Sequence, residues 1–278
     1  MLESTSVSDL GLPSSISWQC PVLNKAFAGG LQNVGISEIY GESSAGKTQL
    51  VLHLSLCVQL PEKDGGRASG CLFICTEDAF PCKRLVEMAT YFSESNTHFQ
   101  EHEEASKKDR VKQFCDFVFV EHISEVSQLI ELLQTKVSVL VRLNKIKLIV
   151  IDSVAALFRS EFSTSDLIER SQWLWKIADA LHQIIKDHDV HVVCINQITG
   201  ADEAQSPFSH PALGLSWSSI INTRICIKRT QYAIKEFNEQ IELYSDVVLR
   251  SMHFVFSSHL PRQLTYFTVN QRGIHGVE

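Results

Sequence analysis

The sequence has no feature that would place the chain in a membrane, and its cysteines do not suggest a metal site. None of its 8 cysteines forms a C-x-x-C pair, and several lie inside apolar runs such as "CLFIC" (71–75) and "HVVCIN" (191–196). This spacing is typical of reduced, buried thiols in an intracellular protein rather than of a zinc site. The longest apolar stretches, such as "KLIVIDSVAALF" (147–158), are too short and too interrupted to cross a bilayer.

The sequence also lacks a visible secretory signal, internal repeats and an excess of positive charge. The polar start "MLESTSVSDLGLPSS" (1–15) has no apolar segment of signal-peptide type, so we expect a protein of the nucleus or cytoplasm. Lys and Arg number 25 against 32 Asp and Glu, which gives a formal net charge of −7. Because contact with phosphates needs cations, this balance argues against a general nucleic-acid coat but leaves room for a local basic patch.

What the sequence does contain is a regular alternation of strand and helix patterns. Residues 1–16 are expected to be a disordered lead-in or linker, and 17–278 to form the folded core. The alternation predicts βαβ units and an α/β fold with a mostly parallel central sheet flanked by helices. The last 55 residues instead read as antiparallel strands. Strands are expected at 35–40, 71–77, 114–122, 147–152, 190–197, 222–230, 252–259 and 264–270. Helices are expected at 48–60, 81–92, 124–143 and 166–188. Residues 93–113 are expected to form a solvated loop or frayed helix, and residues 231–247 a polar insertion.

The stretch "GESSAGKT" (41–48) fits the pattern G-x-x-x-x-G-K-[ST] between an expected strand and an expected helix. Glycines let backbone N–H groups approach phosphates, Lys47 can reach the terminal phosphates, and the Thr48 hydroxyl can bind Mg²⁺. The helix that follows presents its positive end to the anion. The alternative interpretation of this stretch is a Gly/Ser turn at the surface beside a solvated lysine. The expected nucleotide-binding residues here are Gly41, Glu42, Ser43, Ser44, Ala45, Gly46, Lys47, Thr48 and Gln49.

Polar residues end three of the expected strands, and parallel strands bring their carboxyl ends to one edge of the sheet. Asp152 closes an apolar strand, where it can hold Mg²⁺ beside Thr48 or simply cap the next helix. Glu77 can polarise an attacking water, with Asp78 as a rival, although both can also begin the next helix. Gln197 can reach a γ-phosphate or merely end its strand.

Together these stretches resemble the RecA/Rad-type recombinases, and within them a eukaryotic recombinase paralogue. The resemblance covers about residues 17–278 and is carried by "GESSAGKT", "FICTEDAF", "LIVIDSVAALFRSEF", "CINQIT", "PALGLSW" and "NTRICIKR". It implies a RecA-like P-loop ATPase core that binds ATP and Mg²⁺ at a subunit interface. It further implies Glu77 as catalytic glutamate, Asp152 as metal-side carboxylate and Gln197 as γ-phosphate sensor. Arg84 falls where the family stacks an arginine on adenine, and Pro261 where it caps the nucleotide of a neighbouring subunit.

The chain departs from the family in the regions that bind DNA. The family usually carries a small helical DNA-binding domain before the core, where this sequence has about 16 residues. The first DNA-binding loop should follow "ALFRSEF", where Arg159 and Arg170 can contact DNA or pair with Glu161 and Glu169. The second should follow Gln197 and has no Lys or Arg before position 224, so its phosphate contacts should be weak. Its aromatic side chains can stack on bases or pack under the loop; they are Phe208, His210 and Trp217.

Two functional hypotheses follow from these observations. In the first, the chain is an ATPase subunit that binds single-stranded or branched DNA and acts in recombination repair beside the main recombinase filament. In the second, it is an adaptor in which ATP stabilises an interface with another recombinase paralogue and turnover is incidental. We favour a combination: slow ATP hydrolysis and DNA contact that depends on the partner. An unrelated RecA-fold motor fits less well, because of the late antiparallel strands.

Overall fold

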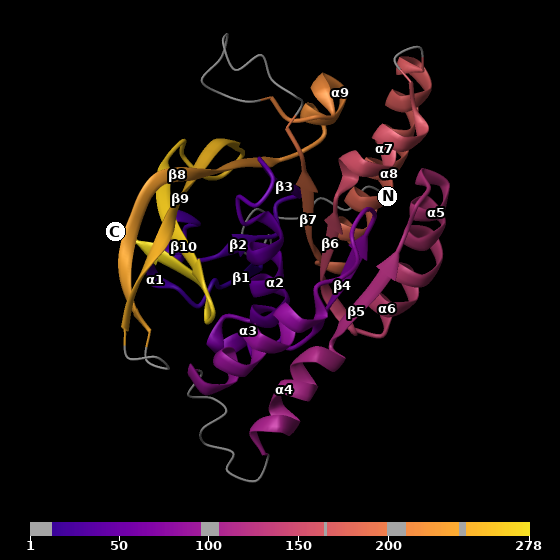
Figure 1. The fold of residues 1–278 in the computed structure, drawn as a ribbon. Helices are drawn as coiled ribbons and strands as arrows, with labels where there is room; N and C mark the ends of the chain where they lie inside the picture. The colour runs from indigo at the N-terminus through magenta and orange to yellow at the C-terminus, as the bar shows by residue number, and fades with distance from the viewer. Residues whose placement is uncertain (1–12, 96–105, 164–165, 199–209, 239–242) are drawn as a thin grey trace, which may run out of the picture.

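The computed structural model describes residues 13–95, 106–163, 166–198, 210–238 and 243–278. They form one large sheet of nine strands with helices on both faces, beside a small two-stranded sheet (Figure 1). The strand order of the large sheet is β11-β10-β9-β8-β3-β7-β6-β4-β5. Its strands are β3 (Ile36–Gly41), β4 (Gly70–Cys75), β5 (Val118–His122), β6 (Ile146–Asp152), β7 (His191–Asn196), β8 (Thr223–Asn238), β9 (Leu243–Ser257), β10 (Leu264–Asn270) and β11 (Gly273–Val277). The small sheet pairs β1 (Ser15–Ile16) with β2 (Leu31–Gln32).

The pairing confirms the predicted fold class. Within the series β8-β3-β7-β6-β4-β5, each strand runs parallel to the next, as βαβ units require. Strands β8, β9, β10 and β11 are joined by antiparallel pairing. The parallel strands therefore place all their carboxyl ends, including those of β3, β4, β6 and β7, at one edge of the sheet.

The helices divide between the two faces. Those on one face are α1 (Pro21–Ala26), α2 (Lys47–Cys57), α3 (Cys82–Ser95) and α4 (Lys107–Asp116), and those on the other are α5 (Val126–Leu132), α6 (Ser138–Arg142), α7 (Val154–Glu161), α8 (Leu167–His188) and α9 (Gly214–Ser218). Successive side chains of a strand point to opposite faces. In β6, Leu148 and Val150 accordingly join one apolar cluster, and Ile149 and Ile151 join the other.

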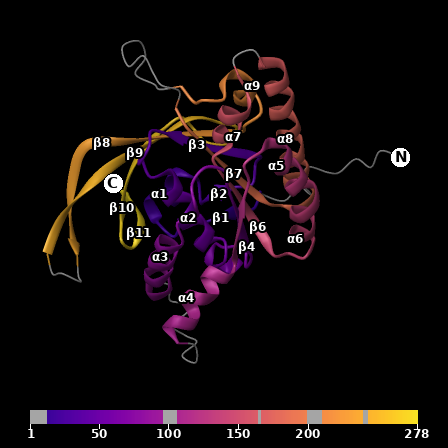
Figure 2. The same cartoon turned by 45° about the vertical axis from the view of Figure 1, so that its right-hand side comes forward.

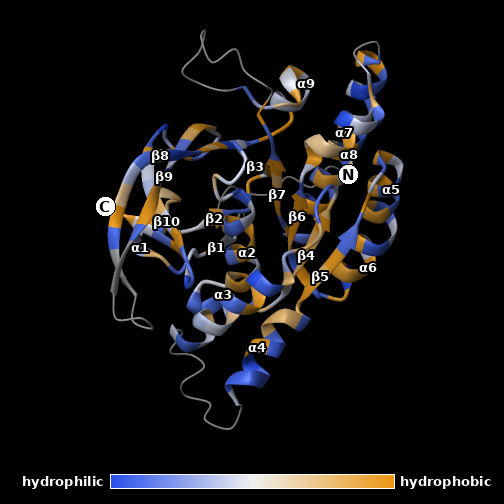
Figure 3. Ribbon diagram, viewed as in Figure 1, coloured by the Kyte–Doolittle hydropathy of each residue, from blue (hydrophilic) through white to orange (hydrophobic). Residues whose placement is uncertain are grey.

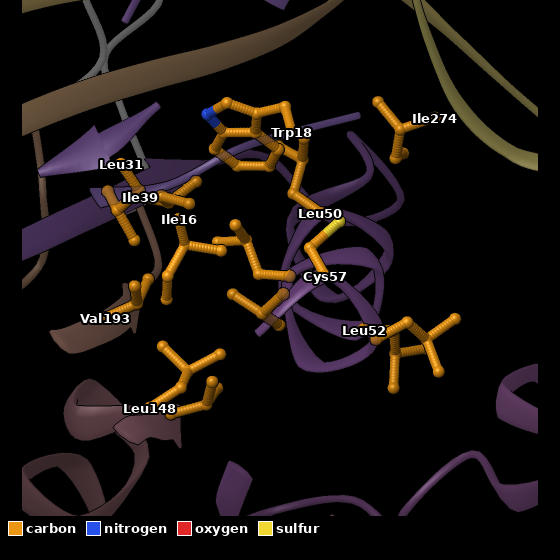
Figure 4. Packing of buried hydrophobic residues seen from close by; sticks show 14 of the residues in the cluster. Ile16, Trp18, Leu31, Ile39, Leu50, Leu52, Cys57, Leu148, Val193 and Ile274 are labelled. Atoms are coloured by element: carbon orange, nitrogen blue, oxygen red, sulfur yellow. The ribbon is translucent and has the colours of Figure 1, made fainter. Parts of the chain in front are cut away.

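Two buried layers hold the sheet and helices together, and they appear as orange stripes on the inner faces in Figure 3. Figure 4 shows the layer around α2, where Leu50 and Leu52 of the helix lie with Ile39 of β3 and Val193 of β7. All the side chains labelled there are at most 4 % exposed. Since α2 begins at the end of the predicted phosphate loop (residues 41–48), this packing fixes that loop on the sheet.

One expected strand starts too early. Residues 107–116 form the helix α4, which is one of the two alternatives expected for 93–113, so the strand expected from 114 begins only at Val118. Ser106 caps α4 by accepting a hydrogen bond from the backbone N–H of Asp109, and this cap starts a helix in a segment that looks merely charged. The expected helix at 124–143 is interrupted by a π-helical turn over Leu133–Val137.

The expected polar insertion at 231–247 was also wrong, because most of it is strand. β8 and β9 pair as a long hairpin, from Thr223↔Ser257 to Asn238↔Leu243, with residues 239–242 outside the described part. Figures 1 and 2 show this hairpin extending beyond the rest of the sheet. The short elements β1, β2, β11, α7 and α9 were not predicted from the sequence. None of the helices in the described ranges has the length and apolar character needed to cross a membrane.

Two buried histidines make the fold sensitive to acid. Burial lowers the pKa of His53 to about 4, and burial likewise lowers that of His191 to about 4. His53 lies on α2, where its Nε2 is 2.7 Å from the carbonyl oxygen of Trp18. Both histidines bind protons more readily in the unfolded chain. The free energy that the neutral histidines contribute to stability is therefore fully present above about pH 6.5 and is lost as the pH falls toward 4.

We expect the free energy of unfolding to fall by roughly 3 kcal/mol for each histidine between pH 7 and pH 4. Urea unfolding at a series of pH values measures this dependence. His53→Gln keeps a donor for the Trp18 carbonyl but does not titrate. It should therefore remove about half of the fall in unfolding free energy that the two histidines cause between pH 7 and pH 4. An unchanged pH dependence in His53→Gln would contradict this assignment.

Candidate functional site

The predicted phosphate loop joins the end of β3 to the start of α2. At Gly41 a Cβ atom would lie 2.1 Å from the carbonyl oxygen of Ile227 on the neighbouring strand β8, so only glycine fits. Gly46, directly before α2, has a φ of +107°, which is unfavourable for other residues. Ala45 between them is fully buried, while Ser43 and Ser44 are exposed. The local structure therefore explains both glycines of the pattern.

Lys47 begins α2 and turns its ammonium group back over the loop. Its Nζ donates to the carbonyl oxygens of Gly41, at 2.9 Å, and Glu42, at 2.7 Å. Burial lowers the pKa of Lys47, against the opposing effect of the Asp152 and Glu42 carboxylates. A phosphate would offer this partly desolvated cation a much stronger partner than two neutral carbonyls.

Asp152 at the end of β6 meets Thr48 in the first turn of α2. The Thr48 hydroxyl donates to Asp152 Oδ2 at 2.8 Å, although the two residues are far apart in sequence. Burial raises the pKa of Asp152, and the Thr48 hydrogen bond and Lys47 oppose that rise. The N-cap of the following helix is Ser153 and not Asp152, so the capping alternative for Asp152 does not hold. A hydroxyl and a carboxylate in contact are suitable oxygen ligands for Mg²⁺.

A cavity of about 560 Å³ at the carboxyl edge of the sheet is lined by many of the predicted residues. Four residues of the predicted loop segment do not line it: Glu42, Ala45, Gly46 and Gln49. Glu77 and Asp78 reach it from the end of β4, and Gln197 from the end of β7. The first turn of α3 contains no acidic residue, so Glu77 and Asp78 do not serve as helix-start charges. The cavity is lined by Gly41, Ser43, Ser44, Lys47, Thr48, Phe73, Cys75, Glu77, Asp78, Ala79, Pro81, Asp152, Ser153, Ile195, Gln197 and Ile198.

Glu77 and Gln197 contact each other, and Arg159 of α7 contacts both. Gln197 Nε2 donates to Glu77 Oε2 at 2.7 Å, and Arg159 donates to Glu77 Oε1 at 2.5 Å. A second guanidinium N–H of Arg159 donates to the side-chain oxygen of Gln197. Arg159 thus pairs with Glu77 and not with Glu161, whose carboxylate accepts from the backbone N–H of Val126. The strand-end pattern predicts Glu77 and Gln197 at one edge of the sheet, but it gives no signal for Arg159, which a separate helix contributes.

Arg84 and Pro261 do not line the cavity. The Arg84 guanidinium donates to Gln49 Oε1 at 2.7 Å, to the carbonyl oxygen of Asn270 at 2.5 Å, and to Glu87. It therefore lies between the phosphate-loop helix and the β10–β11 turn. Pro261 follows β9, whose last residue pairs with Thr223 at the amino end of the parallel strands. It lies at the opposite edge of the sheet from the cavity.

A fully buried carboxylate behind the phosphate loop was missed by the sequence analysis. Glu38 in the middle of β3 accepts from Asn196 Nδ2 at 2.7 Å and Trp217 Nε1 at 2.8 Å, and it forms an ion pair with Arg224. The Asn196 side chain also accepts from the backbone N–H of Gln197 at 2.7 Å. Trp217 is therefore a core residue and not a base-stacking residue.

The other DNA-loop expectations have mixed outcomes. Arg170 donates to the carbonyl oxygen of Ala212, at 3.3 Å, which links α8 to the segment before α9. Phe208 and most of the second loop, with positions 164–165 of the first, lie outside the described residues.

All 8 cysteines are free thiols, five of them buried. The described ranges contain no group of three or more His, Cys, Asp or Glu side chains suited to a metal ion.

Comparisons with known proteins show which family the chain belongs to. The family model described as Rad51 matches residues 15–231. The DNA repair protein XRCC3 of Bos taurus is 36 % identical over 267 residues, which covers 94 % of this chain and 74 % of that protein. XRCC3 of Mus musculus is 36 % identical over 272 residues, covering 94 % and 75 %. The XRCC3 homolog of Arabidopsis thaliana is 35 % identical over 287 residues, covering 93 % and 92 %. With a matching α/β fold and a family match over most of its length, this chain belongs to the Rad51 family.

Proposed function

We propose that this chain is an ATP-binding subunit that acts in homologous recombination repair of DNA in the nucleus. The observation that carries the proposal is the cavity in which the phosphate loop meets Asp152, Glu77 and Gln197. The names of its relatives, which are DNA repair proteins, support the biological role. We further propose a second recombinase paralogue as partner and slow ATP hydrolysis stimulated by single-stranded or branched DNA.

The chemistry assigned to each residue follows from its position. Backbone N–H groups of the loop and Lys47 would bind the phosphates, with Arg84 near the adenine. The residues present fit Mg²⁺, since Thr48 and Asp152 bring a hydroxyl and a carboxylate within 2.8 Å of each other. When bound, Mg²⁺ would neutralise charge on the terminal phosphates. Glu77 would orient and deprotonate water, and Gln197 would hydrogen-bond the γ-phosphate.

Lys47→Ala should weaken ATP binding by roughly 10- to 100-fold, because it removes charge-assisted hydrogen bonds to phosphate. Titration with a fluorescent ATP analogue measures the dissociation constant. Lys63→Ala, at an exposed position in the short 3-10 helix Glu62–Asp64, is the matched control and should bind as the wild type does. Equal affinity in Lys47→Ala and Lys63→Ala would contradict the proposal.

A second candidate function is that of an adaptor in which ATP stabilises a subunit interface. It is supported by Pro261, which lies at the opposite edge of the sheet from the chain's own cavity and so is suited to a neighbour's nucleotide. Co-purification with a candidate paralogue, with and without ATP, tests this role. An adaptor predicts that Lys47→Ala loses the complex; full assembly without nucleotide would exclude it.

A further inference from the structure

The phosphate loop is backed by the β8–β9 hairpin, because β8 lies next to β3 in the sheet (Figure 1). The carboxylate of Glu42 in the loop accepts from the backbone N–H of Arg229 in β8, at 2.9 Å. At Gly46, a Cβ atom would lie 3.3 Å from Cδ and 3.4 Å from Nε of Arg250 in β9. The Arg250 side chain therefore packs directly against the residue that precedes α2.

Arg250 lies on the face of the hairpin that packs against α2. Side chains two residues apart along a strand share a face. Two and four residues after Arg250, Met252 and Phe254 belong to the same buried cluster as Leu50 of α2. Arg250 does not line the cavity at the carboxyl edge of the sheet. Its guanidinium is thus held behind the loop, where it can act on a bound phosphate only through space.

Arg250 lies among positive charges. Its partner across the hairpin is Arg229, and Gly46 stands at the positive end of the α2 dipole. Within the described part of the chain, neither arginine forms an ion pair, and Arg250 Nε is buried without an acceptor. Its Nη1 donates to a neutral group, the carbonyl oxygen of Val248, at 3.0 Å. Burial lowers the pKa of Arg250, and the charge of Arg229 lowers it further.

A half-buried cation in such surroundings is costly unless a negative ligand is bound nearby. The polyphosphate of a nucleotide is the ligand that fits, because it would bring several negative charges to the other side of Gly46. We propose that Arg250 is a specificity-determining cation, which acts through the phosphate loop and favours a nucleoside triphosphate over a diphosphate. The inference rests on the proposed function, which places the phosphates in this loop.

Arg250→Met keeps the length of the side chain and removes its charge. With Mg²⁺ present, it should weaken binding of ATP about 10-fold and of ADP only about 3-fold, because the lost Coulomb energy grows with ligand charge. The magnesium complex of ATP carries one negative charge more than that of ADP. Isothermal titration calorimetry of the whole chain, with a non-hydrolysable ATP analogue and with ADP, measures both dissociation constants.

Three further variants separate charge from packing. Arg250→Gln keeps a donor for the Val248 carbonyl and should show the same two losses as Arg250→Met. Arg250→Lys keeps the charge and should restore most of the affinity for both ligands. Lys235→Met removes a positive charge at an exposed position of β8, whose partner Asp246 lies four residues from Arg250 along β9, and should bind as wild type does. Circular dichroism verifies that each variant is folded.

Three results would overturn the inference. The first is an equal loss for the ATP analogue and for ADP in the neutral variants, since Arg250 would then only hold the shape of the loop. The second is an affinity of Arg250→Lys as low as that of Arg250→Met, and the third is wild-type affinity in both neutral variants. In all three cases the wild-type chain still binds the ATP analogue. A wild-type chain that does not bind it contradicts the proposed function itself.

Discussion

Glu77→Gln is expected to lower the rate of ATP hydrolysis by roughly two to four orders of magnitude, the usual contribution of a positioned general base. Glutamine keeps the size and an oxygen acceptor but cannot take a proton from water. ATP affinity should change little, because in the proposed site Lys47 and the loop, and not Glu77, would bind the phosphates. The turnover number and the dissociation constant for ATP, measured on the same preparation, separate these effects.

The control for this prediction is Asp78→Asn. Asp78 lines the same cavity and follows the same strand, so it is the natural rival for the base. We expect Asp78→Asn to keep most of the turnover. A loss of rate in Asp78→Asn together with normal turnover in Glu77→Gln would transfer the role to Asp78. If neither substitution slows hydrolysis, water activation by a carboxylate at the end of β4 is excluded.

Glu38→Ala is expected to destabilise the folded chain by about 3–5 kcal/mol, the cost of leaving a buried charge without its partner. Glu38 is fully buried and Arg224 is 7 % exposed. The substitution would leave the Arg224 guanidinium without its carboxylate, and the side chains of Asn196 and Trp217 without their acceptor. Urea unfolding at neutral pH measures the free energy of unfolding.

An exposed ion pair provides the comparison. Lys136 pairs with Glu121 on the surface, with side chains 55 % and 26 % exposed, so Lys136→Met should cost only about 0–1 kcal/mol. The double variant Glu38→Met/Arg224→Met removes both charges and should be more stable than Glu38→Ala. A loss below 1 kcal/mol in Glu38→Ala would show that Arg224 is satisfied without Glu38.

Much of the candidate site was predictable from the sequence, because each part of it is local. The loop from Gly41 to Thr48 depends on a short run of backbone that glycine and lysine specify by themselves. Asp152, Glu77 and Gln197 were placed at strand ends, and parallel strands bring such ends to one edge. The structure places these three residues in one cavity with Lys47 and Thr48 of the loop.

The errors lie where local patterns are ambiguous. The 231–247 segment looked like a polar insertion because a hairpin that extends beyond the sheet packs against few apolar neighbours. Its sequence therefore shows little apolar periodicity. Its strands are fixed instead by cross-strand pairs such as Ala233↔Val248. For residues 93–113 the sequence left a solvated loop and a frayed helix open, because only Phe114 of α4 is buried. In both segments the main-chain hydrogen bonds, and not apolar periodicity, define the element.

What the sequence by itself determined is the α/β fold, the phosphate loop and the polar residues that surround it. Only the tertiary structure decided which of those residues touch. It pairs Glu77 with Arg159 and Gln197, from three elements, and gives Glu38 partners from β7, β8 and α9. The reason is physical: backbone conformation follows from neighbours along the chain, whereas side-chain contacts between distant residues exist only once packing has brought their elements together.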